Sequence, residues 1–381
     1  MDEQRFNVKI SIVTVCFNSV KTIEQTIKSV INQSYKYIEY IIIDGGSTDG
    51  TLDIIRKYES YISYWVSEPD KGIYDAMNKG INVASGELIA FINSDDWYDE
   101  NAITHFAEAY TNQSADVLYG DIVYIDEYGK ERYESNAKLN FDKMLYTNIL
   151  CHQAICVRTE LMKNNLFDLR YKLLADYDFL LSLLVAGYSF YYIGNYLIAY
   201  FRWGGVSTVR ILETVNETYE ISSKRFLSKE DLHYDENKIL RIRKIAERRI
   251  CYGKMQQIYN DFMEGKCQFE DYGDILNTKF VIFGVGTVGK QVLELINYLG
   301  AKVECFLDSN SDYWEEQISG IRVLNPQETY IIKSCKVIIT SYEYNDEMAK
   351  VLSGRGLKEN EDYYSFEKWI QWLVEHIKYN S

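Results

Sequence analysis

The sequence predicts an α/β protein with two α/β domains joined by a helical segment. Three observations lead to this prediction. Apolar β-branched runs alternate with helical patterns over the first hundred residues, a charged helical stretch follows at 209–276, and a strand, glycine-rich turn, helix and strand restart at Lys279. Such alternation is typical of a parallel sheet with helices on both faces. We place the domain boundaries at 1–208, 209–276 and 277–381.

The first domain is predicted element by element from the spacing of its apolar residues. We expect strands at 9–17, 39–44, 63–67 and 87–93 and helices at 18–32, 51–58 and 72–84. Further strands are expected at 116–126 and 154–157, and a helix at 175–187 that turns into a strand at 188–201. The stretch 179–201 has no charged side chain. Its glycines and Asn195 nevertheless argue against a transmembrane helix.

Composition excludes several classes of protein. The net charge of −15 disfavours nucleic-acid binding, which requires a basic face. Seven cysteines without a CxxC pair fit neither a disulfide framework nor a zinc site, and indicate a reducing compartment. The charged N-terminus shows no signal peptide, so we expect a cytoplasmic protein.

Membrane contact and assembly stay open at this point. The basic stretch 238–254 is either an exposed charged helix or a surface for anionic lipid or a lipid-linked diphosphate at the inner face of the membrane. A homo-oligomer is equally compatible with the sequence.

Carboxylates follow two of the predicted strands at the points where these strands end. Asp44 ends the second strand, and Asp95 and Asp96 follow the fourth. Ligands of an open parallel sheet bind beyond these carboxyl ends. Clustered carboxylates repel one another unless a cation lies between them, and Mg²⁺ or Mn²⁺ on a diphosphate would fit. Helix capping would explain Asp44 or Asp95 singly, but it explains the adjacent pair and a third carboxylate poorly.

Five motifs in order resemble the inverting family 2 glycosyltransferases of the GT-A (nucleotide-diphospho-sugar transferase) fold. The motifs are TVCFN at 14–18, DGGSTDGT at 44–51, EPDKGIYDAMNKG at 68–80, ASGE at 84–87 and NSDD at 93–96. The resemblance covers about residues 7 to 208. Its most distinctive stretch, KGIYDAMNKG, is similar to bacterial polysaccharide and O-antigen glycosyltransferases.

The resemblance implies a role for each matching position. Asp44 would accept a hydrogen bond from the nucleotide base, with uracil N3–H as the expected donor. Asp96 would ligate Mn²⁺ or Mg²⁺ on the diphosphate. The donor-binding positions are Thr14, Asn18, Asp44, Lys71, Asp75, Asn78, Lys79 and Asp95. Asn78 and Lys79 could instead belong to a solvated helix face.

An inverting transfer needs a carboxylate that takes the proton of the acceptor hydroxyl. The segment LADYD at 174–178 resembles the family's base motif, with Asp176 as the base. Asp178 lies about 200° away around a helix, so only one of the two faces the cleft. Asp176 could also serve as a helix N-cap.

The resemblance also suggests residues on the acceptor side. His152 and Gln153 match a segment that lines the family's acceptor site. For His152 a purely structural hydrogen bond is an equal alternative. Trp203, in FRWGGVST at 201–208, would stack on a sugar or fill the core.

The third segment carries a dinucleotide-binding fingerprint. Gly284, Gly286 and Gly289 form GxGxxG directly after the strand FVIF, and Asp308 follows about 20 residues on. This resembles the small Rossmann-like domains found beside bacterial sugar-modifying enzymes. Nucleotide binding and a structural role both remain open for it.

These observations together predict an inverting glycosyltransferase. It would move a sugar from a nucleotide-sugar donor to an acceptor hydroxyl of a surface polysaccharide or a lipid-linked oligosaccharide. The expected donor is a UDP-sugar. Two rival hypotheses are a nucleotide-sugar-binding scaffold or sensor and an NAD-dependent oxidoreductase built on the C-terminal GxGxxG.

Overall fold

The chain forms two compact units in the computed structural model. The structure describes residues 7–126, 129–137, 139–202, 210–227, 236–269, 277–314, 316–327 and 334–379. The N-terminal unit comprises residues 1–210 and 220–235, and the C-terminal unit comprises 211–219 and 236–381. The predicted helical segment therefore contributes residues to both units.

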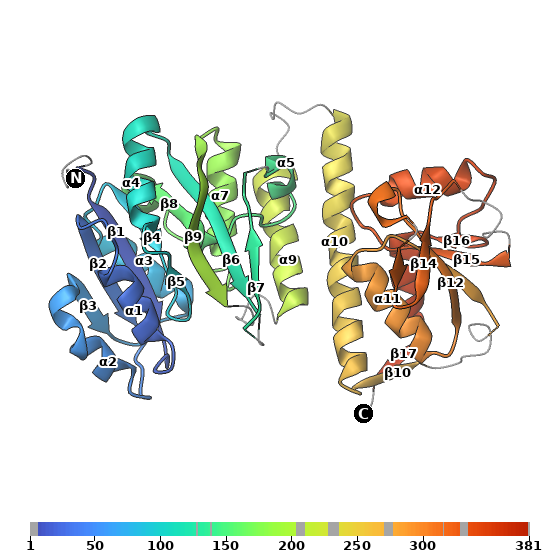
Figure 1. Cartoon of the computed structure of the whole chain (residues 1–381), viewed down its shortest axis with the longest axis horizontal. Helices are drawn as coiled ribbons and strands as arrows, with labels where there is room; N and C mark the ends of the chain where they lie inside the picture. The colour runs from blue at the N-terminus through green and yellow to red at the C-terminus, as the bar shows by residue number, and fades with distance from the viewer. Residues whose placement is uncertain are drawn as a thin grey trace. The chain divides into compact units, whose positions relative to one another are not determined.

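The N-terminal unit is built on one mixed sheet, in the order β3-β2-β1-β4-β8-β6-β9-β5 with β7 paired to β6 (Figure 1). Its strands are β1 (Ile10–Cys16), β2 (Ile38–Asp44), β3 (Tyr64–Ser67), β4 (Leu88–Phe91), β5 (Trp97–Tyr98), β6 (Val117–Ile125), β7 (Glu131–Glu134), β8 (Ile155–Arg158) and β9 (Phe190–Arg202). The pairs among β1 to β4 are parallel, whereas β8 pairs antiparallel with both β4 and β6.

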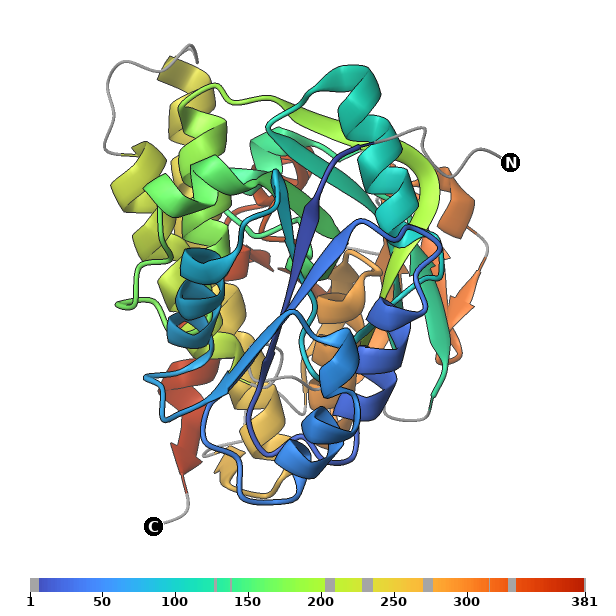
Figure 2. The ribbon, with the colours of Figure 1, turned by 90° about the vertical axis from the view of Figure 1, so that its left-hand side faces the viewer.

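Helices lie on both faces of this sheet (Figure 2). They are α1 (Ile23–Ile31), α2 (Thr51–Lys57), α3 (Ile73–Val83), α4 (Ala102–Gln113), α5 (Phe141–Met144), α6 (Thr159–Asn164), α7 (Ala175–Val185) and the short turns η1 (Glu59–Tyr61) and η2 (His152–Ala154). The helix α9 (Ile211–Ser222) continues into a π-helical turn, η3 (Ser223–Leu227). Helix α3 approaches β1 closely at Gly80, where a Cβ atom would collide with the Val13 side chain.

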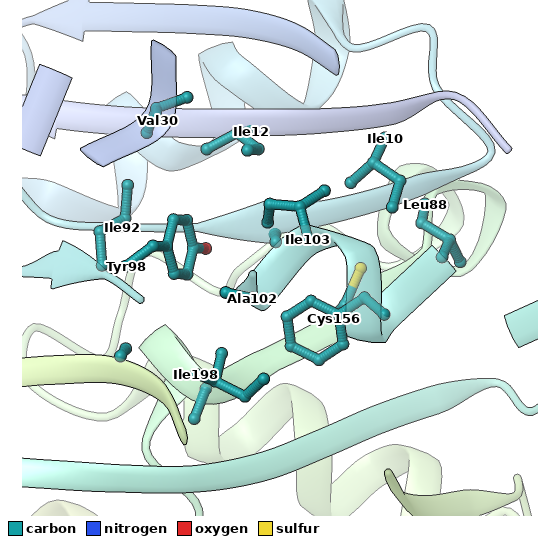
Figure 3. Packing of buried hydrophobic residues seen from close by; sticks show 14 of the residues in the cluster. Ile10, Ile12, Val30, Leu88, Ile92, Tyr98, Ala102, Ile103, Cys156 and Ile198 are labelled. Carbon is teal, nitrogen blue, oxygen red and sulfur yellow. The ribbon is translucent and has the colours of Figure 1, made fainter. Parts of the chain in front are cut away.

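A continuous apolar core fills the space between the sheet and the helices α1 and α4 (Figure 3). Ile10 and Ile12 of β1, Ile27 of α1 and Phe106 of α4 are all fully buried in it. Alternation along β1 sends these two isoleucines to one face and Val13 to the other, toward α3. The predicted strand at 9–17 is thus buried on both faces, which explains its unbroken apolar sequence.

The strand register brings the carboxyl ends of the parallel strands to one edge. Cys16 of β1 is paired with Asp44 of β2, and Asp44 with Ser67 of β3. The helix predicted at 18–32 begins only at Ile23, since the preceding residues form a loop at this edge. The positive φ of 49° at Asn18 marks the turn into that loop.

The C-terminal unit has a second sheet, in the order β13-β14-β12-β11-β15-β16. The strands of this sheet are β11 (Lys279–Phe283), β12 (Lys302–Leu307), β13 (Gln317–Ile318), β14 (Ile321–Leu324), β15 (Lys336–Ile339) and β16 (Tyr363–Tyr364). Two further strands, β10 (Cys267–Phe269) and β17 (Ile377–Tyr379), pair antiparallel in a separate sheet. Its helices are α10 (Glu236–Met263), α11 (Thr287–Tyr298), α12 (Asn345–Ser353), α13 (Phe366–His376) and the turn η4 (Ser311–Tyr313). The pairs formed by β11, β12, β14, β15 and β16 are parallel.

Arginines of α10 pair with carboxylates of the same unit. The buried Arg248 lies 2.7 Å from Asp346 and also contacts Glu367, and Arg241 lies 2.9 Å from Glu347. These contacts favour the charged-helix interpretation of the basic stretch. Among the helices that the structure describes, none combines the length and apolarity needed to cross a bilayer. All seven cysteines are free thiols in this structure.

Candidate active site

A cleft of about 1050 Å³ opens at the carboxyl edge of the N-terminal sheet. It is lined by the loop after β1, the segment before α3, the loop after β4, the turn η2 and the start of α7. Of the residues singled out in the sequence, those lining it are Asn18, Asp95, Asp96, His152, Gln153 and Asp176. The fold therefore brings the metal, base and acceptor candidates to one cavity.

Asp176 lies in the first turn of α7 and is held by several donors. The Tyr74 hydroxyl is 2.8 Å from Oδ1, the Tyr177 amide donates to the same oxygen at 2.9 Å, and His152 Nδ1 is 3.1 Å from Oδ2. Burial opposes ionisation, but the hydrogen bond and charge of His152, with Tyr74, outweigh it, so the pKa of Asp176 lies below its ordinary value. The carboxylate is thus ready to accept a proton.

Asp178 faces away from the cleft. Its two carboxylate oxygens accept hydrogen bonds of 2.7 and 2.6 Å from the Arg225 guanidinium of η3. Its side chain is 3% exposed, and it does not line the cavity. Of the two carboxylates, only Asp176 can meet a substrate in this cleft.

Asp96 is buried beneath the cleft floor and already has donors on both oxygens. Gln153 Nε2 donates to Oδ2 at 2.6 Å, and the Arg202 amide donates to Oδ1 at 2.9 Å. Burial, and then the charge of Asp95, raise the pKa of Asp96 to about 7. Gln153, predicted on the acceptor side, is fully buried and serves to hold Asp96.

Asp95 and Asn93 present oxygens to the same cavity. Among the residues that the structure describes, no side chain donates to the Asp95 carboxylate, and Asn93 Oδ1 is buried without a partner. Arg202 Nη1 instead donates to the backbone carbonyl of Asp95 at 2.6 Å, which fixes the loop. Because no donor from the described residues occupies them, the Asp95 carboxylate and Asn93 Oδ1 are candidate ligands for a hard cation.

Asp44 is enclosed and is not among the residues lining the cleft, so the base-binding role expected for it stays a prediction. It is 0% exposed and accepts hydrogen bonds from the Gly46 and Ser47 amides and from the Ser47 and Ser67 hydroxyls. Burial opposes its ionisation, but these donors outweigh burial, and the pKa of Asp44 is lowered. In this structure Asp44 therefore holds the loop after β2 in place.

Thr14 is likewise enclosed, 0% exposed inside β1 with its hydroxyl 3.2 Å from that of Tyr40. Asn18 does line the cleft, but its side-chain oxygen accepts the Thr48 amide at 3.0 Å. Only the second of these two predicted donor contacts is open to a ligand.

The donor candidates on and before α3 mostly stabilise the fold. Asn78 is bonded twice to the backbone of Phe167, and the Asp75 carboxylate accepts the Lys71 amide at 3.0 Å. Lys79 pairs with Glu68 at 2.8 Å. None of these four predicted positions lines the cleft. Trp203 and its two following glycines lie outside the described residues.

Three residues that line the cleft were not among the site residues predicted from the motifs. Phe17 is 63% exposed in the loop after β1, Asp70 lies before α3, and Tyr74 contacts the base candidate. The signal available for Phe17 was an aromatic residue placed directly after the predicted buried strand, within the TVCFN motif. Asp70 and Tyr74 belong to the EPDKGIYDAMNKG motif but carried no separate signal.

The glycine-rich loop of the C-terminal unit follows β11 and opens α11. Gly284 has a φ of 118°, and a Cβ atom on Gly289 would collide with the Gly284 carbonyl oxygen, whereas the space at Gly286 is open. Asp308 accepts the Val285 amide at 3.0 Å and the Asn310 amide at 2.9 Å. The loop is thus tied to the end of β12, and ligand binding there stays a prediction.

Comparison with known proteins identifies the N-terminal part of the chain. The model of glycosyl transferase family 2 matches residues 11–163. A PGL/p-HBAD biosynthesis glycosyltransferase of Mycobacterium bovis is 30% identical over 175 residues, which cover 44% of this chain and 67% of that protein. The chain belongs to glycosyl transferase family 2.

Further relatives of this glycosyltransferase support the assignment. WfaP of Escherichia coli, a UDP-Glc:alpha-D-GlcNAc-diphosphoundecaprenol beta-1,3-glucosyltransferase, is 35% identical over 158 residues, covering 39% of this chain and 61% of WfaP. Residues 276–361 match a different model, described as C2185-like, N-terminal.

Solved structures confirm the predicted GT-A fold of the enzyme. The crystal structure of Staphylococcus aureus TarS 1-349 in complex with UDP-GlcNAc aligns with a TM-score of 0.52 at 19% identity, covering 66% of this chain and 80% of that chain. The complex of the same protein with UDP gives a TM-score of 0.50 at 21% identity and covers 63% and 71%.

Proposed function

We propose that this glycosyltransferase moves a sugar from a UDP-sugar to an acceptor hydroxyl with inversion at the anomeric carbon. The supporting observation is that Asp176 shares one cleft with Asp95 and Asp96 and is held ionised there. The acceptor oxygen attacks the anomeric carbon while the bond to the diphosphate oxygen breaks. The acceptor proton passes to Asp176, and the nucleoside diphosphate leaves.

The metal assignment moves from Asp96 to Asp95 in this proposal. Asp96 has both oxygens bonded to protein donors, whereas Asp95 and Asn93 line the cleft and Asn93 Oδ1 has no partner among the described residues. The described residues contain no group of three or more His, Cys, Asp or Glu side chains suited to a metal. Mg²⁺ and Mn²⁺ accept such sparse protein ligation when substrate phosphates complete their shell. When bound, the cation offsets the charge that develops on the leaving diphosphate.

The acceptor in this proposal is a lipid-linked saccharide or a surface polysaccharide. Relatives support this class, since WfaP is named for transfer onto a diphosphoundecaprenol-linked sugar. Both kinds of acceptor supply a hydroxyl whose proton Asp176 would take. Contact with the membrane that holds such an acceptor is part of the proposal.

The decisive test is Asp176→Asn. This substitution preserves the shape of the side chain and removes the proton acceptor, so transfer should fall by about 1000-fold or more while UDP-sugar affinity changes less than threefold. Radiolabelled transfer and isothermal titration calorimetry measure the two quantities. Turnover at the wild-type rate would exclude Asp176 as the base.

Removal of divalent cations tests the metal. Excess EDTA should abolish transfer, and Mn²⁺ or Mg²⁺ should restore it. Asp95→Asn should raise the Mn²⁺ concentration needed for half-maximal activity more than Asp96→Asn does. Full activity in EDTA would remove the cation from the mechanism, and the reverse ranking would return it to Asp96.

A further inference from the structure

The hydroxyl of Tyr74 lies between two hydrogen-bond acceptors. Its oxygen is 2.8 Å from Asp176 Oδ1 and 2.8 Å from the carbonyl oxygen of Leu173. A tyrosine hydroxyl carries one hydrogen, so it makes one full hydrogen bond as a donor at a time. The proposed function assigns a task to the carboxylate of Asp176 but none to the second contact of Tyr74.

The charge of Asp176 decides which of the two bonds is made. An ionised carboxylate only accepts, and a hydrogen bond to it is stronger than one to a neutral carbonyl, so Tyr74 then donates to Oδ1. A protonated Asp176 has a hydrogen of its own. With this hydrogen on Oδ1, Asp176 donates to the Tyr74 oxygen, and the Tyr74 hydrogen turns to the Leu173 carbonyl. Both arrangements use the same positions of the heavy atoms.

Packing holds these heavy atoms in place. Tyr74 lies in the first turn of α3, is 6% exposed and lines the cleft, and its ring packs against Phe167 with the centroids 5.4 Å apart. Asp176 is 7% exposed, and the Tyr177 amide holds its Oδ1 from the other side at 2.9 Å. The hydrogen of Tyr74 can therefore turn while the oxygen and the carboxylate stay where they are.

The surroundings of Asp176 offer no second group of this kind. His152 of η2 contacts the other oxygen, Oδ2. Burial raises the pKa of the nearby Cys151 thiol far above its ordinary value, so this thiol stays neutral. The small cavity that Asp176 and His152 share is otherwise lined by apolar side chains. Among the described residues, Tyr74 is the side chain bonded to Oδ1.

We infer that Tyr74 is a positioning residue whose hydroxyl turns from Asp176 to the Leu173 carbonyl as Asp176 takes the proton of the acceptor. This inference rests on the proposed function, because it takes Asp176 as the base. In this step the O–H bond of the acceptor breaks and an O–H bond of Asp176 forms, while the O–H bond of Tyr74 is kept and only rotates. Tyr74 thus donates to the charged form of the base and accepts from the neutral form.

The test is Tyr74→Phe, which removes the hydroxyl and keeps the ring that packs against Phe167. The assay is the release of UDP by the full chain from UDP-glucose and from UDP-GlcNAc, with Mn²⁺ present and water as the acceptor. At pH 8, kcat should fall about tenfold to thirtyfold, because the protonated Asp176 loses the atom to which it donates.

The pH profile and the affinity for UDP complete this measurement. The hydrogen bond from Tyr74 lowers the pKa of Asp176, so its loss should move the acid limb of kcat/KM to higher pH, by about one unit. Affinity for UDP, measured by calorimetry, should change less than about threefold. An acid limb that moves while kcat stays unchanged would show that Tyr74 serves the ionised form alone, and would overturn the inference.

Two control variants separate this role from a structural one. The Tyr35 hydroxyl donates to the Val8 carbonyl at 2.7 Å, before β1 and at the end opposite the cleft, so Tyr35→Phe should leave kcat and the acid limb unchanged. In the Asp176→Asn background, Tyr74→Phe should change the residual rate by less than about twofold, since Tyr74 acts through Asp176.

The failure of this inference and that of the proposed function give different results. Equal losses of kcat from Tyr74→Phe in both backgrounds would report a structural role of Tyr74. An unchanged kcat and an unmoved acid limb would mean that the hydroxyl has no role in the reaction. Either result would overturn the inference and leave the proposed function intact. Turnover of Asp176→Asn at the wild-type rate would overturn both.

Discussion

At the scale of single residues, the contacts of Asp176 decide how the proposed base works. A general base is most effective when its pKa lies near the working pH, yet His152 lowers the pKa of Asp176. The gain is a carboxylate that stays ionised although it is buried. His152 Nε2 has no partner among the described residues, which fits an Nδ1–H tautomer aimed at Asp176.

We predict that His152→Leu moves the acid limb of the pH profile of kcat/KM to higher pH. Without His152, burial dominates and raises the pKa of Asp176, so the ionised fraction is lost at a higher pH as the solution is acidified. His152→Asn, which keeps an N–H near the position of Nδ1, should restore part of the wild-type profile. An unshifted acid limb in His152→Leu would show that His152 does not control this carboxylate.

At the scale of elements, η3 packs behind the helix that carries the base. Arg225 of η3 forms a two-bond ion pair with Asp178, and the Tyr177 hydroxyl lies 2.9 Å from that of Ser222. Successive residues of α7 thus face the cleft, the core and η3. The position of Asp176 therefore depends on the contacts that hold α7 as well as on the hydrogen bonds of the Asp176 side chain.

We expect Arg225→Met to destabilise the N-terminal unit by on the order of 3 kcal/mol, because it leaves the buried Asp178 carboxylate uncompensated. The double variant with Asp178→Leu should lose less stability than Arg225→Met alone. Urea unfolding monitored by circular dichroism gives these free energies. Additive effects of the two substitutions would mean that the pair is not coupled.

At the scale of the whole molecule, the two larger sheets have separate apolar cores within one chain. The helix α9 crosses the boundary, with residues 211–219 in the C-terminal unit and 220–222 in the N-terminal unit. Because the two cores are separate, we expect a substitution that disturbs the C-terminal core to lower the stability of the C-terminal unit more than that of the N-terminal unit.

The glycines of the C-terminal loop provide this test as a matched pair. Gly289→Ala places a methyl group against the Gly284 carbonyl and should lower the melting temperature of the C-terminal unit by several degrees, while Gly286→Ala meets open space and should be neutral. Differential scanning calorimetry resolves the effect. Equal melting temperatures for the two variants would contradict the close approach of α11 to the loop.

The sequence by itself determined the family, the GT-A fold and the first strands and helices within a few residues. Buried parallel strands have continuous apolar runs, and the motif order is preserved along the chain, so both are readable without coordinates. It also placed Asp95, Asp96, His152 and Asp176 at one site.

Tertiary structure alone decided which of these side chains face the cleft. Asp44 ends β2 and Asp96 follows β4, at the same edge of the sheet, but hydrogen-bond donors from other segments occupy the oxygens of both. A motif specifies residue types and their spacing. Whether a carboxylate is accessible to a ligand depends on whether donors from distant segments already bond its oxygens, and only the tertiary structure shows this.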